Sequence, residues 1–180
     1  MKRKNLKANS KFHIVYKLLL LVIVGLIVLV YVGSILIPKF AKDSKFLAAI
    51  YASVLINLAN YDRKDTELLP LNVNPLLSLA AENKAKDMAR RGYFSHNTPE
   101  GILPWHWIKE AGYDYLYAGE NLAVNFDDSK DVEQAWMNSP THKANILNYN
   151  FTDIGIGMAT GTWNGKEAIF VVQMFGSPKK

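Results

Sequence analysis

Three side chains of this sequence have the chemistry for metal binding or proton transfer: His96, Glu120 and His142. His96 follows Ser95 in a loop after a strongly capped helix, and loops held by rigid elements often carry functional groups. Glu120 follows a glycine and precedes an apolar run, so we expect it at the edge of a buried strand. The spacing of the three is weak evidence by itself, because most single histidines and acids are structural or solvated.

The segment 135–148, AWMNSPTHKANILN, explains why His142 is of interest. It starts as a helix, breaks at Asn138–Pro140 and restarts with His142 in the first turn, with Ser139 as the expected N-cap. A helix N-terminus has a positive potential that disfavours imidazolium. A neutral imidazole keeps a lone pair that binds a metal or accepts a proton. Asn145 lies three residues further along the same helix face and is a further candidate.

The elements that must position these residues follow from capping and periodicity. Asn74 and Pro75 begin a helix that Gly92 ends. The residues that recur in it at helical spacing are Leu76, Leu79, Ala80, Asn83, Asp87 and Met88. Further expected elements are helices at 44–61 and 103–111, a strand at 122–126, a helix capped by Asp128 or Ser129, and strands at 154–158 and 168–175 joined by an Asn164-Gly165 turn. Helices followed by an antiparallel hairpin predict an α+β fold.

Composition narrows the function classes. With 49% hydrophobic and 21% charged residues, the 180-residue chain is globular rather than disordered. It has no cysteine, which excludes disulfides, thiolate metal sites and cysteine nucleophiles. Residues 1–45 carry nine Lys or Arg against one Asp, whereas the remainder carries twelve against fifteen acids. The main domain is therefore slightly acidic, and we expect no nucleic-acid partner.

An apolar segment, Leu18–Ile37, has twenty residues without a charge, which matches the thickness of a bilayer. Six basic residues precede it, so the positive-inside rule places the N-terminus in the cytoplasm and the main domain outside. The alternative is a signal peptide that is cleaved to give a secreted protein, but the segment is long for one. The expected organisation is a basic cytoplasmic tail (1–17), a single-pass transmembrane anchor in the cell membrane (18–37), a tether (38–45), the folded domain (46–176) and a short tail (177–180).

Six short motifs occur in a characteristic order. They are Asn74–Met88, Phe94–His96, Gly119–Leu122, Ala135–Leu147, Ile154–Gly157 and Gln173–Gly176. This pattern resembles the bacterial, cysteine-free branch of the CAP superfamily, the SCP domain, whose relatives include cysteine-rich secretory, antigen five and pathogenesis-related proteins. The resemblance implies a three-layer α-β-α sandwich with a small antiparallel sheet, preceded here by the transmembrane helix.

The resemblance also implies a cleft where His96, Glu120 and His142 meet. The family's further cleft acid maps onto Glu133. The C-terminal strand has no histidine at 170–173, so His142 has to serve as the second imidazole. Some relatives bind zinc or another divalent metal in such a cluster, and two imidazoles with a carboxylate are an allowed zinc set.

Three functions follow as hypotheses. The first is a membrane-anchored extracytoplasmic module whose His/Glu cleft binds a small ligand, a peptide or a cell-envelope component. The second is a metal-dependent hydrolase of envelope peptide or polysaccharide, with Glu120 or a histidine as acid or base and Ser95 as a possible nucleophile. The third is a scaffold in which the cluster only holds loops together. The sequence leaves catalysis open and favours binding.

Overall fold

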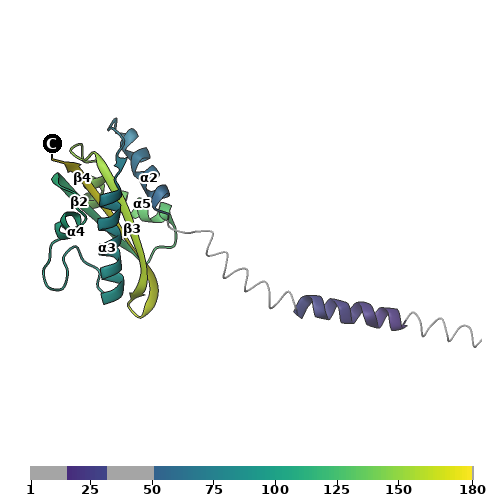
Figure 1. Cartoon of the computed structure of the whole chain (residues 1–180). Coiled ribbons are helices and arrows are strands. Elements are labelled where there is room, and N and C mark those ends of the chain that lie inside the picture. Colours follow the sequence, from purple (N-terminus) through teal and green to yellow (C-terminus); the bar gives the residue numbers. More distant parts are fainter. Residues whose placement is uncertain (1–15, 32–50, 180) are drawn as a thin grey trace, which may run out of the picture. The chain divides into compact units, whose positions relative to one another are not determined.

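The computed structural model describes residues 16–31 and 51–179, in two compact units, Met1–Leu47 and Ala48–Lys180. In the first unit, residues 16–31 form a helix whose apolar side chains are exposed (Figure 1). Among the described residues, no helix combines the length and the apolar character needed to cross a membrane. The expected anchor extends beyond this helix, and its residues 32–37 lie outside the described residues, as do the tether and most of the basic tail.

The second unit combines helices with one small sheet that ends in a hairpin, which confirms the α+β prediction. Its elements in chain order are α2 (Ala52–Lys64), β1 (Asn72–Val73), α3 (Pro75–Arg91), α4 (Trp105–Glu110), β2 (Tyr115–Val124), α5 (Ser129–Asn138), α6 (Pro140–Ile146), β3 (Asp153–Trp163) and β4 (Lys166–Pro178) (Figure 1). Strand β2 begins well before the expected start at residue 122, so Glu120 lies inside it rather than ahead of it.

The four strands form one sheet in the order β1-β3-β4-β2. Strand β4 pairs antiparallel with both β2 and β3. The β3–β4 hairpin turns at Asn164 and Gly165, whose φ angles of 51° and 76° fit the expected tight turn. Strand β1 instead pairs parallel with β3, which corrects the expectation of a purely antiparallel sheet. Residues 74–152 lie between these two strands in the sequence, so no hairpin fixes their direction.

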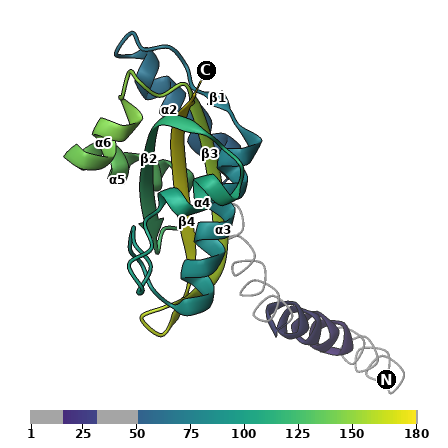
Figure 2. The same ribbon diagram turned by 60° about the vertical axis from the view of Figure 1, so that its left-hand side comes forward.

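Helices cover both faces of the sheet, as expected for a three-layer sandwich. On β4, Phe170, Val172 and Met174 pack in the core that contains α3 and α4. The alternate residues Val171 and Phe175 pack in the core that contains α2, α5 and α6. Figure 2 shows α3 on one side of the sheet and α5 and α6 on the other.

Helix α3 has the predicted ends but a partly different buried face. The Asn74 side chain accepts hydrogen bonds at the first turn, and Gly92 ends the helix with a φ of 68°. Of the expected positions, Leu76 and Leu79 are 40% and 45% exposed, whereas Ala80, Asp87 and Met88 are buried. The buried residues of the helix, three of them alanines, are Leu77, Ala80, Ala81, Lys84, Ala85, Asp87 and Met88. Small residues are needed because a Cβ at Gly157 of β3 would lie 2.0 Å from the α3 backbone.

Candidate functional site

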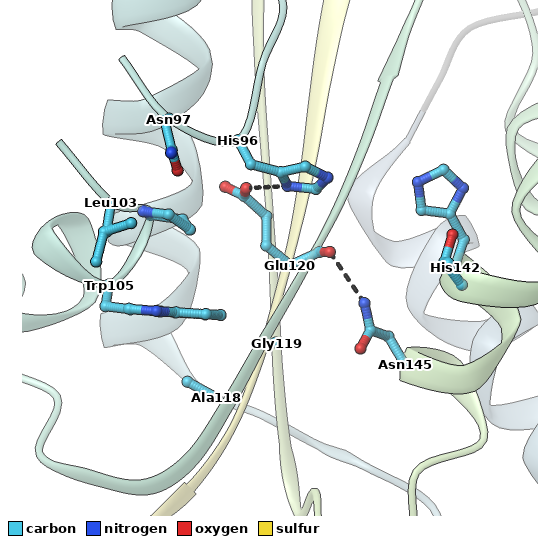
Figure 3. A pocket seen from close by; sticks show the side chains of 11 residues that line it. His96, Asn97, Leu103, Trp105, Ala118, Gly119, Glu120, His142 and Asn145 are labelled. Atoms are coloured by element: carbon cyan, nitrogen blue, oxygen red, sulfur yellow. Dashed lines mark hydrogen bonds and ion pairs between the residues drawn. The ribbon is translucent and has the colours of Figure 1, made fainter. Parts of the chain in front are cut away.

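A pocket of about 340 Å³ opens between β2, α4, α6 and the loops after α3. Its lining residues are His96, Asn97, Leu103, Pro104, Trp105, Ala118, Gly119, Glu120, Thr141, His142 and Asn145 (Figure 3). One wall is largely apolar and includes Leu103 and Trp105. The other carries two imidazoles, a carboxylate and amides. Mixed walls of this kind are typical of small-molecule and peptide sites.

His96 and Glu120 form a close pair in this pocket. The His96 Nδ1 lies 2.6 Å from Glu120 Oε1, and the side chains are 54% and 2% exposed, respectively. Burial raises the pKa of the Glu120 carboxyl, while the hydrogen bond to His96 and the charge of Lys84 oppose this rise. The second oxygen, Oε2, is buried and has no hydrogen-bond partner among the described residues. The carboxyl group therefore has one unused acceptor on its buried side, next to the pocket wall.

His142 faces this pair from α6. The rings of His96 and His142 point toward one another across the pocket (Figure 3). Burial lowers the pKa of His142, and the charge of His96 lowers it further. The direction matches the neutral imidazole expected from the helix start, with burial as the main cause. Ser139 occupies the N-cap position, but its hydroxyl lies 3.2 Å from the Thr141 hydroxyl and makes no cap hydrogen bond, which corrects that detail.

A buried amide network fixes α6 against the sheet. The Asn121 amide donates to His142 O at 3.2 Å and to Gln173 Oε1 at 2.9 Å. The Asn145 amide donates to Glu120 O at 3.0 Å and to Asn121 Oδ1 at 2.8 Å (Figure 3). These contacts hold His142 and Asn145 at the pocket.

Two other candidate residues lie elsewhere. Ser95 is exposed and does not line the pocket. Glu133 is buried on α5 near Asp62 of α2, and neither of its carboxyl oxygens has a hydrogen-bond partner among the described residues. Burial and the charge of Asp62 raise the pKa of Glu133 to about 8. Glu133 does not line the pocket.

The resemblance implies a divalent metal held by His96, Glu120 and His142. Among the described residues, no three His, Asp or Glu side chains form a group that could hold an ion. Glu120 is engaged with His96 Nδ1, the position of a carboxylate that orients a ligating histidine. With Glu120 as an orienting partner, the described residues of the pocket offer two imidazoles, fewer protein ligands than the three or four of a usual zinc site.

Two residues next to the site were missed by sequence reasoning. Trp105 forms part of the apolar wall, and nothing in its local sequence distinguishes it from a core residue. Lys84 is fully buried beneath His96. Its spacing did contain a signal, since it shares a helix face with Ala80, Ala81 and Met88. A lysine on a buried stripe needs a partner, and this alone could have pointed to a polar site nearby.

Comparison with known proteins supplies the wider context. The model of the family described as CAP, the cysteine-rich secretory protein family, matches residues 56–175. In Bacillus subtilis (strain 168), the uncharacterized protein YkwD is 40% identical over 107 residues, which cover 59% of this chain and 42% of YkwD. The uncharacterized membrane protein YlbC of the same strain is 28% identical over 131 residues, which cover 72% of this chain and 38% of YlbC. The chain thus spans about four-tenths of the length of these curated relatives.

Solved structures share the fold. An extracellular protein containing an SCP domain from Bacillus anthracis str. Ames matches with a TM-score of 0.59 and 28% identity, over 69% of this chain and 39% of that chain. An outer surface protein from Borrelia burgdorferi matches with a TM-score of 0.60 and 26% identity, over 71% of this chain and 92% of that chain.

Proposed function

Because the chain belongs to the CAP family of cysteine-rich secretory proteins, we propose that it is a membrane-anchored, extracytoplasmic binding module. Its pocket would hold a small ligand or peptide of the cell envelope. The observation that carries this proposal is the pocket itself, where the His96–Glu120 pair and His142 converge beside an apolar wall. A concave site with a few convergent polar groups, one of them a carboxyl of raised pKa, is typical of a binding site.

The proposed location rests on the sequence and on relatives. The uncharged segment Leu18–Ile37 with its preceding basic residues has the composition of an anchor with a cytoplasmic N-terminus. One relative is named a membrane protein, and one structural neighbour is named an extracellular protein. The first name favours a membrane location, and the second favours a domain outside the cell.

A divalent metal such as zinc is a further part of the proposal. The residues that would hold it are His96, through the ring nitrogen not bonded to Glu120, and His142. When bound, such an ion would polarise a ligand oxygen or lower the pKa of a bound water. Glu120 would keep the His96 ring in one orientation and one tautomer.

Hydrolysis is the second candidate, and the short His96–Glu120 contact is the observation that favours it. A carboxylate that orients an imidazole is the arrangement of a general base. Binding is favoured because, in the described part of the chain, neither imidazole makes a hydrogen bond to a serine or threonine hydroxyl. A water molecule would have to be the nucleophile.

The test uses the full chain in detergent, with soluble peptide and glycan fragments of bacterial cell wall as probes. We expect at least one probe class to bind, and Glu120→Gln to weaken that binding about tenfold, because the neutral amide is a poorer acceptor. His106→Ala is the matched control, since His106 is exposed and does not line the pocket. Equal affinity for wild type and Glu120→Gln would contradict the proposed site, and turnover of a bound probe would favour the hydrolase.

Zinc alone is the second probe. An ion that binds only the folded state raises the melting temperature by mass action. We expect a rise with wild type and none with His142→Ala. No rise for wild type at high micromolar zinc would remove the metal from the proposal and leave the organic ligand untouched.

A further inference from the structure

We infer that Lys84 is the positioning residue of the site: its buried ammonium, anchored on α3, holds the His96 backbone and so sets the His96 ring against Glu120. The Lys84 Nζ donates to the His96 carbonyl oxygen at 2.7 Å. Its meaning for ligand binding rests on the proposed function, whereas the positioning itself does not.

The burial of Lys84 calls for an explanation, because the residue is 0% exposed. Removing an ammonium from water is costly unless its hydrogen bonds and charge are compensated. Apart from His96 O, its partners are the Tyr93 hydroxyl at 3.3 Å and the Tyr93 ring, whose centroid is 5.0 Å away. The carboxylates of Asp87 and Glu120 both attract its charge. The lysine thus lies between the helix and the pocket acid.

The loop that carries His96 needs such a support. Ser95, His96 and Asn97 are all exposed, so little packing holds this part of the loop. Its two flanks are tied to α3, because Tyr93 Oη donates to Asp87 at 2.8 Å and Arg91 pairs with Glu100. Lys84 supplies the contact between these flanks, directly at the histidine.

The rigidity of α3 makes the contact effective. The helix is capped at both ends, by Asn74 and Gly92, and packs closely on the glycines of β3. Glu120 is fixed independently by its place in β2, opposite Met174 of β4. Lys84 therefore joins two rigid parts of the domain through an otherwise exposed loop, and the 2.6 Å His96–Glu120 contact depends on it.

The test follows the His96 ring by NMR in the full chain, with ring-¹⁵N histidine in detergent at about pH 8.5. The sequence has four histidines, so single variants assign the signals. A carboxylate partner at Nδ1 selects the Nδ1–H tautomer, which distinguishes His96 from an exposed imidazole. We expect this tautomer in wild type and its loss in Lys84→Met, with the His142 signals unchanged.

The control is Lys86→Met, which removes an exposed lysine of the same helix that forms an ion pair with Glu82. It should leave His96 as in wild type. If Lys84→Met does not fold, Lys84→Gln keeps a donor of shorter reach, and we expect a mixture of His96 tautomers. A folded Lys84 variant with the wild-type His96 tautomer would overturn the inference.

Zinc and the wall-fragment probes are then applied to the same samples. A misplaced His96 should weaken binding by about tenfold, which is the usual effect of losing an orienting contact. If no probe binds wild type, the proposed function fails, yet the tautomer result still decides whether Lys84 positions His96.

Discussion

The two histidines of the pocket are both held through their backbone carbonyls, but the side chains that hold them differ in chemistry. Each backbone carbonyl accepts a hydrogen bond from a buried side chain, His96 from Lys84 and His142 from Asn121. On the His96 side the support is an ion among carboxylates, and the histidine lies in a loop. On the His142 side it is a neutral amide network, and the histidine lies in helix α6.

Because the supporting side chains differ, we expect mutations on the two sides of the pocket to have different effects. A buried ion has already lost its hydration, so replacing it with an apolar side chain recovers much of the energy that its contacts supply. A buried amide that is lost leaves several partners unsatisfied, and nothing offsets them. The amide side should therefore carry more of the stability, and the ionic side should carry more of the ring's placement.

The largest effect should come from Asn121→Ala. Asn121 is fully buried, and its loss removes the donor to Gln173 Oε1 and His142 O and one of the two acceptors of the Asn145 amide. We expect the free energy of unfolding to fall by about 2–4 kcal/mol, measured by urea unfolding. Asn138→Ala, at the exposed end of α5, is the control. A loss below about 1 kcal/mol would contradict the expectation that the amide side carries more of the stability.

The second prediction concerns Glu133, a buried acid outside the pocket. It shows how burial changes the pKa of a carboxyl that has no ionic partner among the described residues. Its folded pKa of about 8 exceeds the ordinary value of 4.5, so the folded state holds a proton that the unfolded state releases. Stability from this group is therefore present at low pH and is lost as pH rises from 4.5 to about 8.

Glu133→Gln removes this titration while keeping the shape of the side chain. We expect the variant to be about 1–3 kcal/mol more stable than wild type at pH 8 and to show a flatter pH dependence. Melting temperatures across pH 5 to 8 provide the measurement, and Glu82→Gln on the surface of α3 is the control. Parallel curves for wild type and Glu133→Gln would show that the carboxyl is ionised throughout.

Local signals explain which parts of the fold were predictable. The ends of α3 and the Asn164-Gly165 hairpin were predicted correctly, because caps and tight turns depend on a few neighbouring residues. The exposed Leu76 and the parallel pairing of β1 were not, because both depend on which distant strand the element meets. Glycines on β3 decide the buried face of α3, and nothing within α3 shows this.

The same distinction between local signals and distant contacts applies to the site. His96, Glu120, His142 and Asn145 were singled out from the sequence, and the structure brings all four to one pocket. Their supports were not predicted. Lys84 reaches the site only because the loop after α3 folds back over it, and that path is not encoded in the residues next to it.

The third prediction compares the ionic support of His96 directly with the amide support of His142. Lys84→Met should change the free energy of unfolding by no more than about 1 kcal/mol, although it removes a fully buried charge. Asp87 keeps Arg90 and Arg91, and Glu120, whose pKa burial already raises, takes up a proton once Lys84 and His96 no longer oppose that rise. Urea unfolding of this variant beside Asn121→Ala compares the two supports. Equal losses would mean that ion and amide carry the same share of stability.

The smallest effect should come from His142 itself. Its pKa is lowered in the folded state, so the unfolded chain binds a proton first as the solution is acidified. The stability that neutral His142 provides is complete above the ordinary pKa of about 6.5 and declines as pH falls below it. His142→Gln should abolish this decline. Because the side chain is only partly buried, we expect a difference of about 0.5 kcal/mol between pH 5 and pH 7.5.

This measurement belongs in the Glu133→Gln background, since the titration of Glu133 runs in the opposite direction over the same pH range. His106→Gln is the control, because His106 is exposed and outside the pocket. If His142→Gln and His106→Gln changed the acid decline equally, burial on α6 would not keep this imidazole neutral. If only His142→Gln removes the decline, His142 is a neutral imidazole on α6 that neutral amides hold in place. His96, on the opposite side of the pocket, is then the histidine held by a charged side chain.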